Sequence, residues 1–460
     1  MGKVIQYGGW AVALALFLYS AFLTSQLTKS RDALSTVDHT GVMKEPAIER
    51  APAHVMLEEK LRETEAKLTE ANALLAEASQ ADSPVLMEEA PEVPEAVSDD
   101  GNDDEEANDA EPSQQERIAQ AQAGAMVDMI YGDLFAELGL TPVVACELEF
   151  YLIDPERGPM HEPQPPTLPK SGKVSSGTQV YSIYEMDEFA DVLYDIADAC
   201  RVQEIPAGPA SAEYATGQFE INLNHVDDPL AACDHSALLQ RVIRGVARKH
   251  GFEATFMAKP YPDGTGSGLH VHCSLLDKDG NNVFDDGTDA GGPMLRHAIG
   301  GMLATMMEGM AIFAPNRNSY RRFVYNSFVP LRAAWSYNNR STALRIPAGD
   351  GASRRFEHRI SGADANPYLT LAAILAGMHH GIVNQIEPEP AVEGNAGEIV
   401  DPDMPRTWQR ALDRAGRAEV LNHYFGDEYW RRYLQCKQNE LDRFSSMISP
   451  LEYDWYLLCG

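Results

Sequence analysis

Apolar and polar residues alternate along residues 146–154 (CELEFYLID), with the period of two that is typical of a β-strand. One face of this predicted strand carries three apolar side chains, those of Leu148, Phe150 and Leu152. Glu147 and Glu149 fall together on the other face. Neighbouring carboxylates repel each other, so the pair needs water or a cation to compensate its charge. A solvated strand face and a cation site are both open interpretations of this pattern.

A long apolar run lies near the start of the chain. Residues 8–27 (GGWAVALALFLYSAFLTSQL) carry no charge and have about the length that crosses a bilayer as a helix, which predicts a transmembrane anchor over residues 1–28. A cleaved signal peptide is the alternative, although the run is long for one and no A-x-A site follows. Lys3 precedes the run, and Lys29 and Arg31 follow it. This charge distribution favours a cytoplasmic location for the rest of the chain.

The next segment, residues 29–117, is highly charged. Leucines recur at seven-residue spacing in EEKLRETEAKLTEANALLAEA, which predicts a solvated helix or a short coiled coil. Residues 82–116 contain fourteen Asp or Glu residues and neither Lys nor Arg, so they are expected to form a disordered acidic linker. Helical and strand-like patterns alternate from residue 118 to residue 460, and we place the folded domain there.

Charge and cysteine content exclude several classes of function. Acidic residues outnumber basic ones by 69 to 37, which argues against a nucleic-acid partner because phosphate backbones are bound by clustered Lys and Arg. The six cysteines form no CxxC pair, so neither a zinc ribbon nor a disulfide framework is indicated. A reducing compartment fits this cysteine usage best.

Further candidate ligands follow the acidic pair. The segment SAEYATGQFEINLNH contains Glu213 and Glu220, and FMAKPYPDGTGSGLHVHCSLLD places His270 and His272 on one face of a predicted strand after a Gly-rich loop. A single strand histidine is more often a satisfied structural group than a ligand, and a lone Gly-rich loop is a weak phosphate signal. Four carboxylates and an imidazole on strand-like segments, however, form a set suited to Mg²⁺ or Mn²⁺.

Arginines are concentrated in one part of this acidic chain. Residues 317–359 contain nine arginines, no lysine, and only two acidic residues, Asp350 and Glu357. Arginine favours planar, bidentate recognition of carboxylate or phosphate, so the segment indicates an anion site. A basic surface stripe is the alternative.

Together these motifs resemble the catalytic domain of the glutamine synthetase family. Over residues 120–460 the chain contains, in the family's order, ELEF, EYATGQFEINL, KPYPDGTGSGLHVHCSLLD, NSYRRF, NNRSTALRIPAG, RRFEHR and ANPYLTLAAILAG. The details GQFEINLNH and SGADANPYL resemble the γ-glutamylpolyamine (γ-glutamylputrescine) synthetases more than the ammonia-using enzymes. The resemblance implies an α+β fold, a curved antiparallel sheet flanked by helices.

The resemblance also implies a reaction and a set of site residues. ATP phosphorylates the γ-carboxylate of glutamate, and an amine then displaces the phosphate. The implied ligands of two or more Mg²⁺ or Mn²⁺ ions are Glu149, Glu213 and Glu220 for one ion and Glu147, His270 and Glu357 for the second. The implied glutamate contacts are Arg322, Arg359, Thr265 and Gly266. The implied ATP contacts are His272, Ser274, Arg345 and Arg355. Arg340, on the transferring phosphoryl group, and Glu357 are the implied catalytic residues.

Two positions depart from the ammonia-using pattern. Phe328 stands six residues after Arg322, where those enzymes carry a glutamate that binds ammonium and removes its proton. Thr265 replaces an asparagine that contacts glutamate. Both departures favour an organic amine such as putrescine over ammonia, with Phe328 in the amine site.

Family members also carry an N-terminal β-grasp domain that completes the neighbouring subunit's site, and no stretch of this sequence resembles it. The expected partners are ATP, glutamate, an amine, the membrane through the N-terminal helix, and copies of the same chain if the family's assembly persists. Nucleic acid is not among them. A membrane-tethered pseudoenzyme or partner subunit, which binds ATP, metal or glutamate without efficient turnover, is the main alternative. A guanidino-kinase-like phosphotransferase is less favoured because such enzymes lack the ELEF and GSGLHVH pattern.

Overall fold

The computed structural model describes residues 123–174, 179–325 and 327–459, which belong to one compact unit beginning at Ala123. The predicted anchor, heptad segment and acidic linker lie outside these residues, and they remain predictions. None of the helices in the described ranges is both long and apolar enough to span a bilayer.

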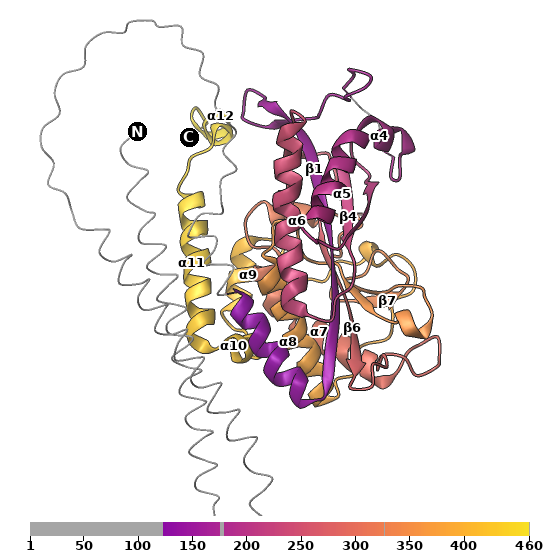
Figure 1. Cartoon of the computed structure of the whole chain (residues 1–460). Helices are drawn as coiled ribbons and strands as arrows, with labels where there is room; N and C mark the ends of the chain where they lie inside the picture. Colours follow the sequence, from indigo (N-terminus) through magenta and orange to yellow (C-terminus); the bar gives the residue numbers. More distant parts are fainter. Residues whose placement is uncertain (1–122, 175–178, 326, 460) are drawn as a thin grey trace, which may run out of the picture. The chain divides into compact units, whose positions relative to one another are not determined.

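A mixed β-sheet forms the centre of this unit (Figure 1). Its strands are β1 (Leu140–Arg157), β2 (Pro163–Gln164), β3 (Ala207–Ala212), β4 (Gln218–Leu223), β5 (Glu253–Thr255), β6 (Leu269–Asp277), β7 (Trp335–Tyr337), β8 (Leu344–Ile346) and β9 (Phe356–His358). Seven of them follow the order β3-β4-β1-β6-β9-β8-β7, and β2 and β5 both pair with β1.

The expectation of a wholly antiparallel sheet is wrong at one edge. The strands β7 and β8 pair in parallel, whereas the other strand pairs of the described sheet are antiparallel. Side-chain alternation has the same period in both arrangements, so it reveals which residues share a face but not the direction of a neighbouring strand.

Helices surround the sheet. They are η2 (Met129–Phe135), α4 (Ile183–Glu188), α5 (Ala190–Val202), α6 (Pro229–Lys249), α7 (Pro293–Phe313), η3 (Ser319–Arg322), η4 (Gly351–Ser353), α8 (Pro367–Asn384), η5 (Ala396–Glu398), α9 (Trp408–Ala415), α10 (Val420–Phe425), α11 (Asp427–Ser445) and α12 (Pro450–Tyr456). The long helix α6 packs on β1, and α5 packs on α6 and β3 (Figure 1). The helices α7 and α8 pack against each other.

Local sequence signals explain where the long helices begin. Asp228 accepts a hydrogen bond from the backbone N–H of Ala231 at the start of α6, and Asn366 accepts one from Leu369 at the start of α8. Both helices have proline as their first residue, where its missing N–H costs nothing. The α8 sequence is apolar on nearly all sides, and the structure buries most of it.

The predicted strand over residues 146–154 is confirmed as the central part of β1. The side chains of Leu148, Phe150 and Leu152 are fully buried on one face. The acidic face is covered as well, because Glu147 is only 9% exposed and Glu149 is half-buried. A solvated strand face is therefore excluded, and the acidic pair needs compensation from inside the protein.

Candidate active site

Strand pairing brings the predicted ligands together from four neighbouring strands. The directly opposed pairs are Glu149 and Glu220 between β1 and β4, Glu147 and His270 between β1 and β6, and His272 and Glu357 between β6 and β9. Directly opposed residues have Cβ atoms about 5 Å apart, so each pair can share a ligand. The sheet register thus assembles a cluster from segments more than 200 residues apart in the chain.

Glu147 lies at the centre of this cluster. Its Oε1 is 2.6 Å from Nδ1 of His270, and its Oε2 is 3.2 Å from Nε2 of His272. The His270 Nδ1 atom is also 3.6 Å from Oε1 of Glu357. Two groups have ligand atoms within 4.8 Å of one another, namely Glu147, Glu149, Glu220 and His270, and Glu147, His272 and Glu357. Carboxylate oxygens with one imidazole in each group suit Mg²⁺ or Mn²⁺.

These groups differ in part from the expected ligand sets. Glu147 belongs to both groups, and His272, expected at the nucleotide, lies within the second. Glu213 belongs to neither group. It shares a hydrogen bond with Glu220, and it lines a pocket together with Glu149 and His270. The division of the ligands between two ions therefore stays a prediction.

The electrostatics of the cluster also fit a divalent cation. Burial and the neighbouring carboxylates raise the pKa of Glu220 to about 10, and burial with the charge of Glu149 raises that of Glu213 to about 7. Burial alone would raise the pKa of Glu147 too, but His270 and His272 hold it well below its usual range. A cation among these carboxylates would favour their charged forms, which crowding otherwise opposes.

Arginines compensate the most deeply buried carboxylate. Glu357 is 1% exposed and accepts hydrogen bonds from Nη1 of Arg359 and, at 2.8 Å, from Nη1 of Arg345. Burial would raise its pKa, but Arg359, His270 and His272 lower it to about 2. Glu357 therefore remains ionised and available to a cation.

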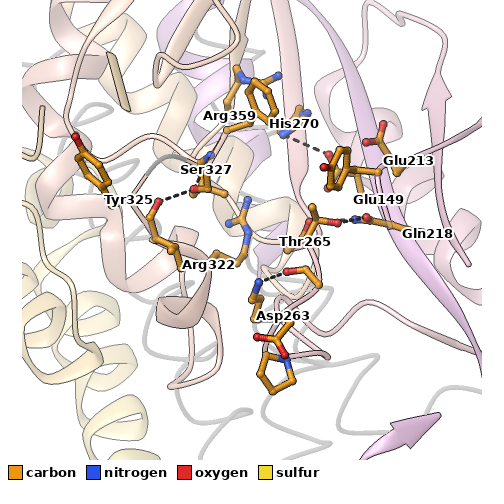
Figure 2. Close-up of a pocket in the computed structure, with 18 residues that line it drawn as sticks. Glu149, Glu213, Gln218, Asp263, Thr265, His270, Arg322, Tyr325, Ser327 and Arg359 are labelled. Atoms are coloured by element: carbon orange, nitrogen blue, oxygen red, sulfur yellow. Dashed lines mark hydrogen bonds and ion pairs between the residues drawn. The ribbon is translucent and has the colours of Figure 1, made fainter. Parts of the chain in front are cut away.

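A pocket of about 350 Å³ opens beside the cluster (Figure 2). Glu149, Glu213 and His270 line one side, and the buried arginines Arg322 and Arg359 also reach it. In Figure 2, Arg322 lies on one side of Thr265 and the carboxylates of Glu149 and Glu213 lie on the other, whereas Arg359 lies near His270. The pocket thus combines a cation-binding side with fixed positive charges suited to a carboxylate.

The Gly-rich loop between β5 and β6 forms another wall, and β4 fixes its position. Gln218 accepts a hydrogen bond from Oγ1 of Thr265 and donates one from Nε2 to the carbonyl oxygen of Gly266 at 3.0 Å. The Tyr151 hydroxyl donates to the Thr265 carbonyl oxygen at 2.8 Å. Gly266 has no room for a side chain, because an added Cβ would lie 2.7 Å from Cγ of Arg322.

Phe328 lines the pocket as part of a mainly apolar segment. Val324, Tyr325 and Val329 line the pocket together with Phe328, whose side chain is 72% exposed. An exposed aromatic residue beside a polar pocket offers contact surface to an apolar part of a ligand. This placement is compatible with the expected amine site.

The remaining predicted residues lie around the cluster. Nε of Arg355 donates to Nδ1 of His272 at 3.3 Å, so this arginine is adjacent to the second ligand group. Ser274 is half-buried on β6, two residues beyond His272. Arg340 has an exposed side chain, and its carbonyl oxygen accepts a hydrogen bond from Nε of Arg359 at 3.2 Å. The structure therefore brings all of them to the region of the cluster except the side chain of Arg340, which faces solvent.

Sequence reasoning missed several pocket residues. Tyr214, Lys259, Asp263 and Tyr325 line the pocket, and Gln218 anchors its loop. All of these except Tyr325 stand inside the motifs EYATGQFEINL and KPYPDGTGSG, so motif membership was the signal that could have identified them. Nothing in the local charge or periodicity distinguishes Tyr325.

Comparison with known proteins gives a consistent result. A sequence model described as the glutamine synthetase catalytic domain matches residues 131–456, which is more than half of the chain. The chain is 45% identical over 319 residues to the γ-glutamylputrescine synthetase PuuA of Escherichia coli K12, covering 69% of this chain and 68% of that protein. It is 32% identical over 327 residues to a glutamate–isopropylamine ligase of a Pseudomonas species, covering 70% of each.

Solved structures agree with the sequence relatives. A structure titled as a complex of GmaS with ADP superimposes with a TM-score of 0.65 and 25% identity, covering 73% of this chain and 77% of that one. The fold, the site and these relatives define a carboxylate–amine ligase. The chain belongs to the glutamine synthetase family.

Proposed function

We propose that this chain joins the γ-carboxylate of glutamate to an organic amine in an ATP-dependent reaction. The observation that carries the proposal is a single pocket lined by Glu149 and His270 of the carboxylate–imidazole cluster and by the two buried arginines Arg322 and Arg359. Relatives named for putrescine and isopropylamine support an amine larger than ammonia.

The reaction has two balanced steps. A γ-carboxylate oxygen of glutamate attacks the terminal phosphorus of ATP, and ADP leaves with the electrons of the broken P–O bond. The amine nitrogen then attacks the γ-carbonyl carbon of the γ-glutamyl phosphate, the C–O bond to phosphate breaks, and the nitrogen loses one proton. The products are a γ-glutamyl amide, ADP and phosphate.

Arg322 and Arg359 are suited to hold glutamate by its α-carboxylate. Both are buried and line the pocket, and a guanidinium group donates two parallel hydrogen bonds to a carboxylate. With the α-carboxylate held by these guanidinium groups, the γ-carboxylate would extend within the pocket toward Glu149 and His270. This orientation brings the reacting oxygen to the cluster.

The nucleotide would lie on the side of Glu147, His272 and Glu357. Arg345 and Arg355 contact this group through Glu357 and His272, and they supply positive charge for the phosphates of ATP. When bound, divalent cations would neutralise those phosphates and the charge that develops during transfer. Arg345 is pre-ordered for its role by a second hydrogen bond, at 3.1 Å, to Oδ1 of Asn338.

The amine would enter past Phe328. The surrounding wall of Val324, Tyr325 and Val329 gains contact with an alkyl chain but offers no charge to ammonium. A preference for alkyl amines follows, because each methylene buried against such a wall is worth about 1–3 kcal/mol in discrimination.

The test uses the full chain with ATP, Mg²⁺, L-glutamate and a panel of putrescine, isopropylamine and ammonium. Phosphate release and γ-glutamyl amide are measured in parallel, with Glu149→Gln as the inactive control. We expect amide and phosphate in equal amounts, with putrescine or isopropylamine used faster than ammonium. A clear preference for ammonium would contradict the organic-amine assignment.

A second candidate is a partner subunit that binds ATP and glutamate with little turnover. The observation that favours it is that the alignments cover 68% and 70% of the two relatives named above, and that the family's N-terminal β-grasp domain was not found in this sequence. If no neighbouring subunit covers the site, water can reach the acyl phosphate and hydrolyse it. In this case phosphate release would exceed amide formation. Restoration of amide formation by mixing with an intact family member would support the partner role.

A further inference from the structure

Arg322 is a buried charge with few direct partners. Its side chain is 3% exposed, and Nη1 donates to the carbonyl oxygen of Ile360 at 3.0 Å. Its buried Nε has no hydrogen-bond partner among the described residues. Burial lowers the pKa of this arginine, and the carboxylates of Glu149 and Asp364 oppose that effect. Glu149 belongs to the metal cluster, so Asp364 is the carboxylate with no assigned role.

Asp364 lies in the segment between β9 and α8. An ideal Cβ placed on Gly362 would be 2.4 Å from Oδ1 of Asp364 and 3.4 Å from Nη1 of Arg322. The carboxylate and the guanidinium therefore both approach the same point above Gly362. This Oδ1 atom is buried and has no hydrogen-bond partner within the described chain. Burial raises the pKa of Asp364, and the charge of Arg322 is among the effects that lower it, so the two side chains interact electrostatically without a direct hydrogen bond.

The other oxygen of Asp364 holds the segment that carries Arg322. Its Oδ2 accepts hydrogen bonds from Nδ2 of Asn316 and from Oγ of Ser319, each at 2.7 Å. Ser319 is the first residue of η3, and Arg322 is the last. Residues i and i+3 of a 3₁₀ turn lie above one another, so the hydrogen bonds that fix Ser319 also hold the single turn from which Arg322 projects.

The same segment is connected to the Gly-rich loop. Oδ1 of Asn318 accepts from the backbone N–H of Lys259 at 2.8 Å, and its Nδ2 donates to the Lys259 carbonyl oxygen at 2.9 Å. Oδ1 of Asn316 accepts from the backbone N–H groups of Asn318 and Ser319. Asp364 thus stands at the base of a hydrogen-bond network that reaches two walls of the substrate pocket.

We propose that Asp364 is a positioning residue for recognition of the substrate's α-carboxylate. It fixes the start of η3 through Asn316 and Ser319, and it places a carboxylate near the guanidinium group of Arg322. The proposal rests on the proposed function, in which Arg322 binds the α-carboxylate of glutamate. In this proposal Asp364 touches neither the substrate nor the reacting atoms, and it acts on the α-carboxylate through Arg322.

The test compares two ligands that differ only in the α-carboxylate. Isothermal titration of the full chain, with Mg²⁺ and ADP present so that no phosphoryl transfer occurs, gives dissociation constants for L-glutamate and for 4-aminobutyrate. In Asp364→Asn the preference for L-glutamate over 4-aminobutyrate should fall about tenfold, as expected when a charge-assisted contact is weakened. Affinity for 4-aminobutyrate should stay unchanged, because this ligand does not use the positioned arginine.

Three control variants separate the possible outcomes. Ser319→Ala removes one hydrogen bond to Oδ2 of Asp364, so it should reduce the preference for L-glutamate less than Asp364→Asn does. If Asp364→Asn does not fold, Ser319→Ala serves as the test variant in its place. Glu308→Gln alters a half-buried carboxylate that accepts two backbone N–H groups outside the pocket, from Glu419 and Leu421, and should leave the preference intact. Arg322→Gln should abolish the preference.

An equal loss of affinity for both ligands in Asp364→Asn would reduce Asp364 to a structural residue and overturn the proposal. The proposal is also overturned if Arg322→Gln abolishes the preference while Asp364→Asn and Ser319→Ala retain it. If Arg322→Gln retains the preference, or if the unaltered chain has none, the α-carboxylate site itself is wrong, and the positioning role falls with it.

Discussion

Glu357→Gln should destabilise the folded domain strongly, because it removes the negative charge that the buried Arg359 and the half-buried Arg345 share. The carboxylate accepts from Nη1 of both Arg345 and Arg359. Glutamine keeps the volume but can accept through only one oxygen, so its NH₂ group would face one of the two guanidinium groups. Breaking a buried ion pair on one side typically costs about 3–5 kcal/mol.

The pKa of Glu357 gives an independent value for the free energy that its ion pairs contribute to folding. Its fall from 4.5 to about 2 corresponds to about 3 kcal/mol, at 1.36 kcal/mol for each pKa unit. A carboxylate whose pKa is lowered in the folded state stabilises that state fully when the pH is above the pKa of the unfolded state. This stability is lost as the pH falls from about 4.5 toward 2. The difference between parent and variant should therefore be about 1 kcal/mol smaller at pH 4 than at pH 7.

Urea unfolding of the full chain at pH 7 and pH 4 measures this difference, with a chelator present so that cation binding to the folded state does not contribute. Glu428→Gln is the matched control, because Glu428 also contacts two arginines, Arg431 and Arg432, but at the surface. Exposed pairs contribute about 0–1 kcal/mol. A loss below about 1 kcal/mol in Glu357→Gln would refute the argument that buried arginines depend on this carboxylate.

Other parts of the molecule give three further predictions. Titration with Mn²⁺ should show binding that weakens strongly in Glu149→Gln and in His270→Ala, and parent-like affinity in both would contradict the ligand assignment. Phe328→Ala should reduce the preference for putrescine over ammonium by about tenfold in amine-competition assays, because it removes the apolar wall; an unchanged ratio would place the amine elsewhere. Gly301→Ala should lower the free energy of unfolding by about 1–3 kcal/mol, since the new Cβ would lie 2.2 Å from the Gly377 carbonyl oxygen and must separate α7 from α8. In the last case Gly132→Ala, where the added Cβ meets no atom within 4 Å, is the control, and equal stability of the two variants would contradict the close packing of these helices.

The sequence by itself determined the local features of the site. Alternation placed Glu147 and Glu149 on one face of a strand, because side chains of a strand alternate whatever the strand pairs with. The absence of lysine among the nine arginines of residues 317–359 indicated anion recognition, because only a guanidinium group offers two parallel donors. Motif order was sufficient to indicate the family, which the comparisons confirm.

Only the tertiary structure decided which of these groups meet. Register between strands distant in the chain set His270 opposite Glu147 and His272 opposite Glu357, and no local pattern encodes such a register. The sequence also did not predict the parallel pairing of β7 and β8, because side-chain alternation is the same for parallel and antiparallel neighbours. In the sequence SGADANPYL, Asp364 has the pattern of an ordinary turn residue, and only the packed domain brings it near Arg322. Its contribution depends on burial and on the position of a charge more than 40 residues away, which are properties of the packed domain and not of any segment within it.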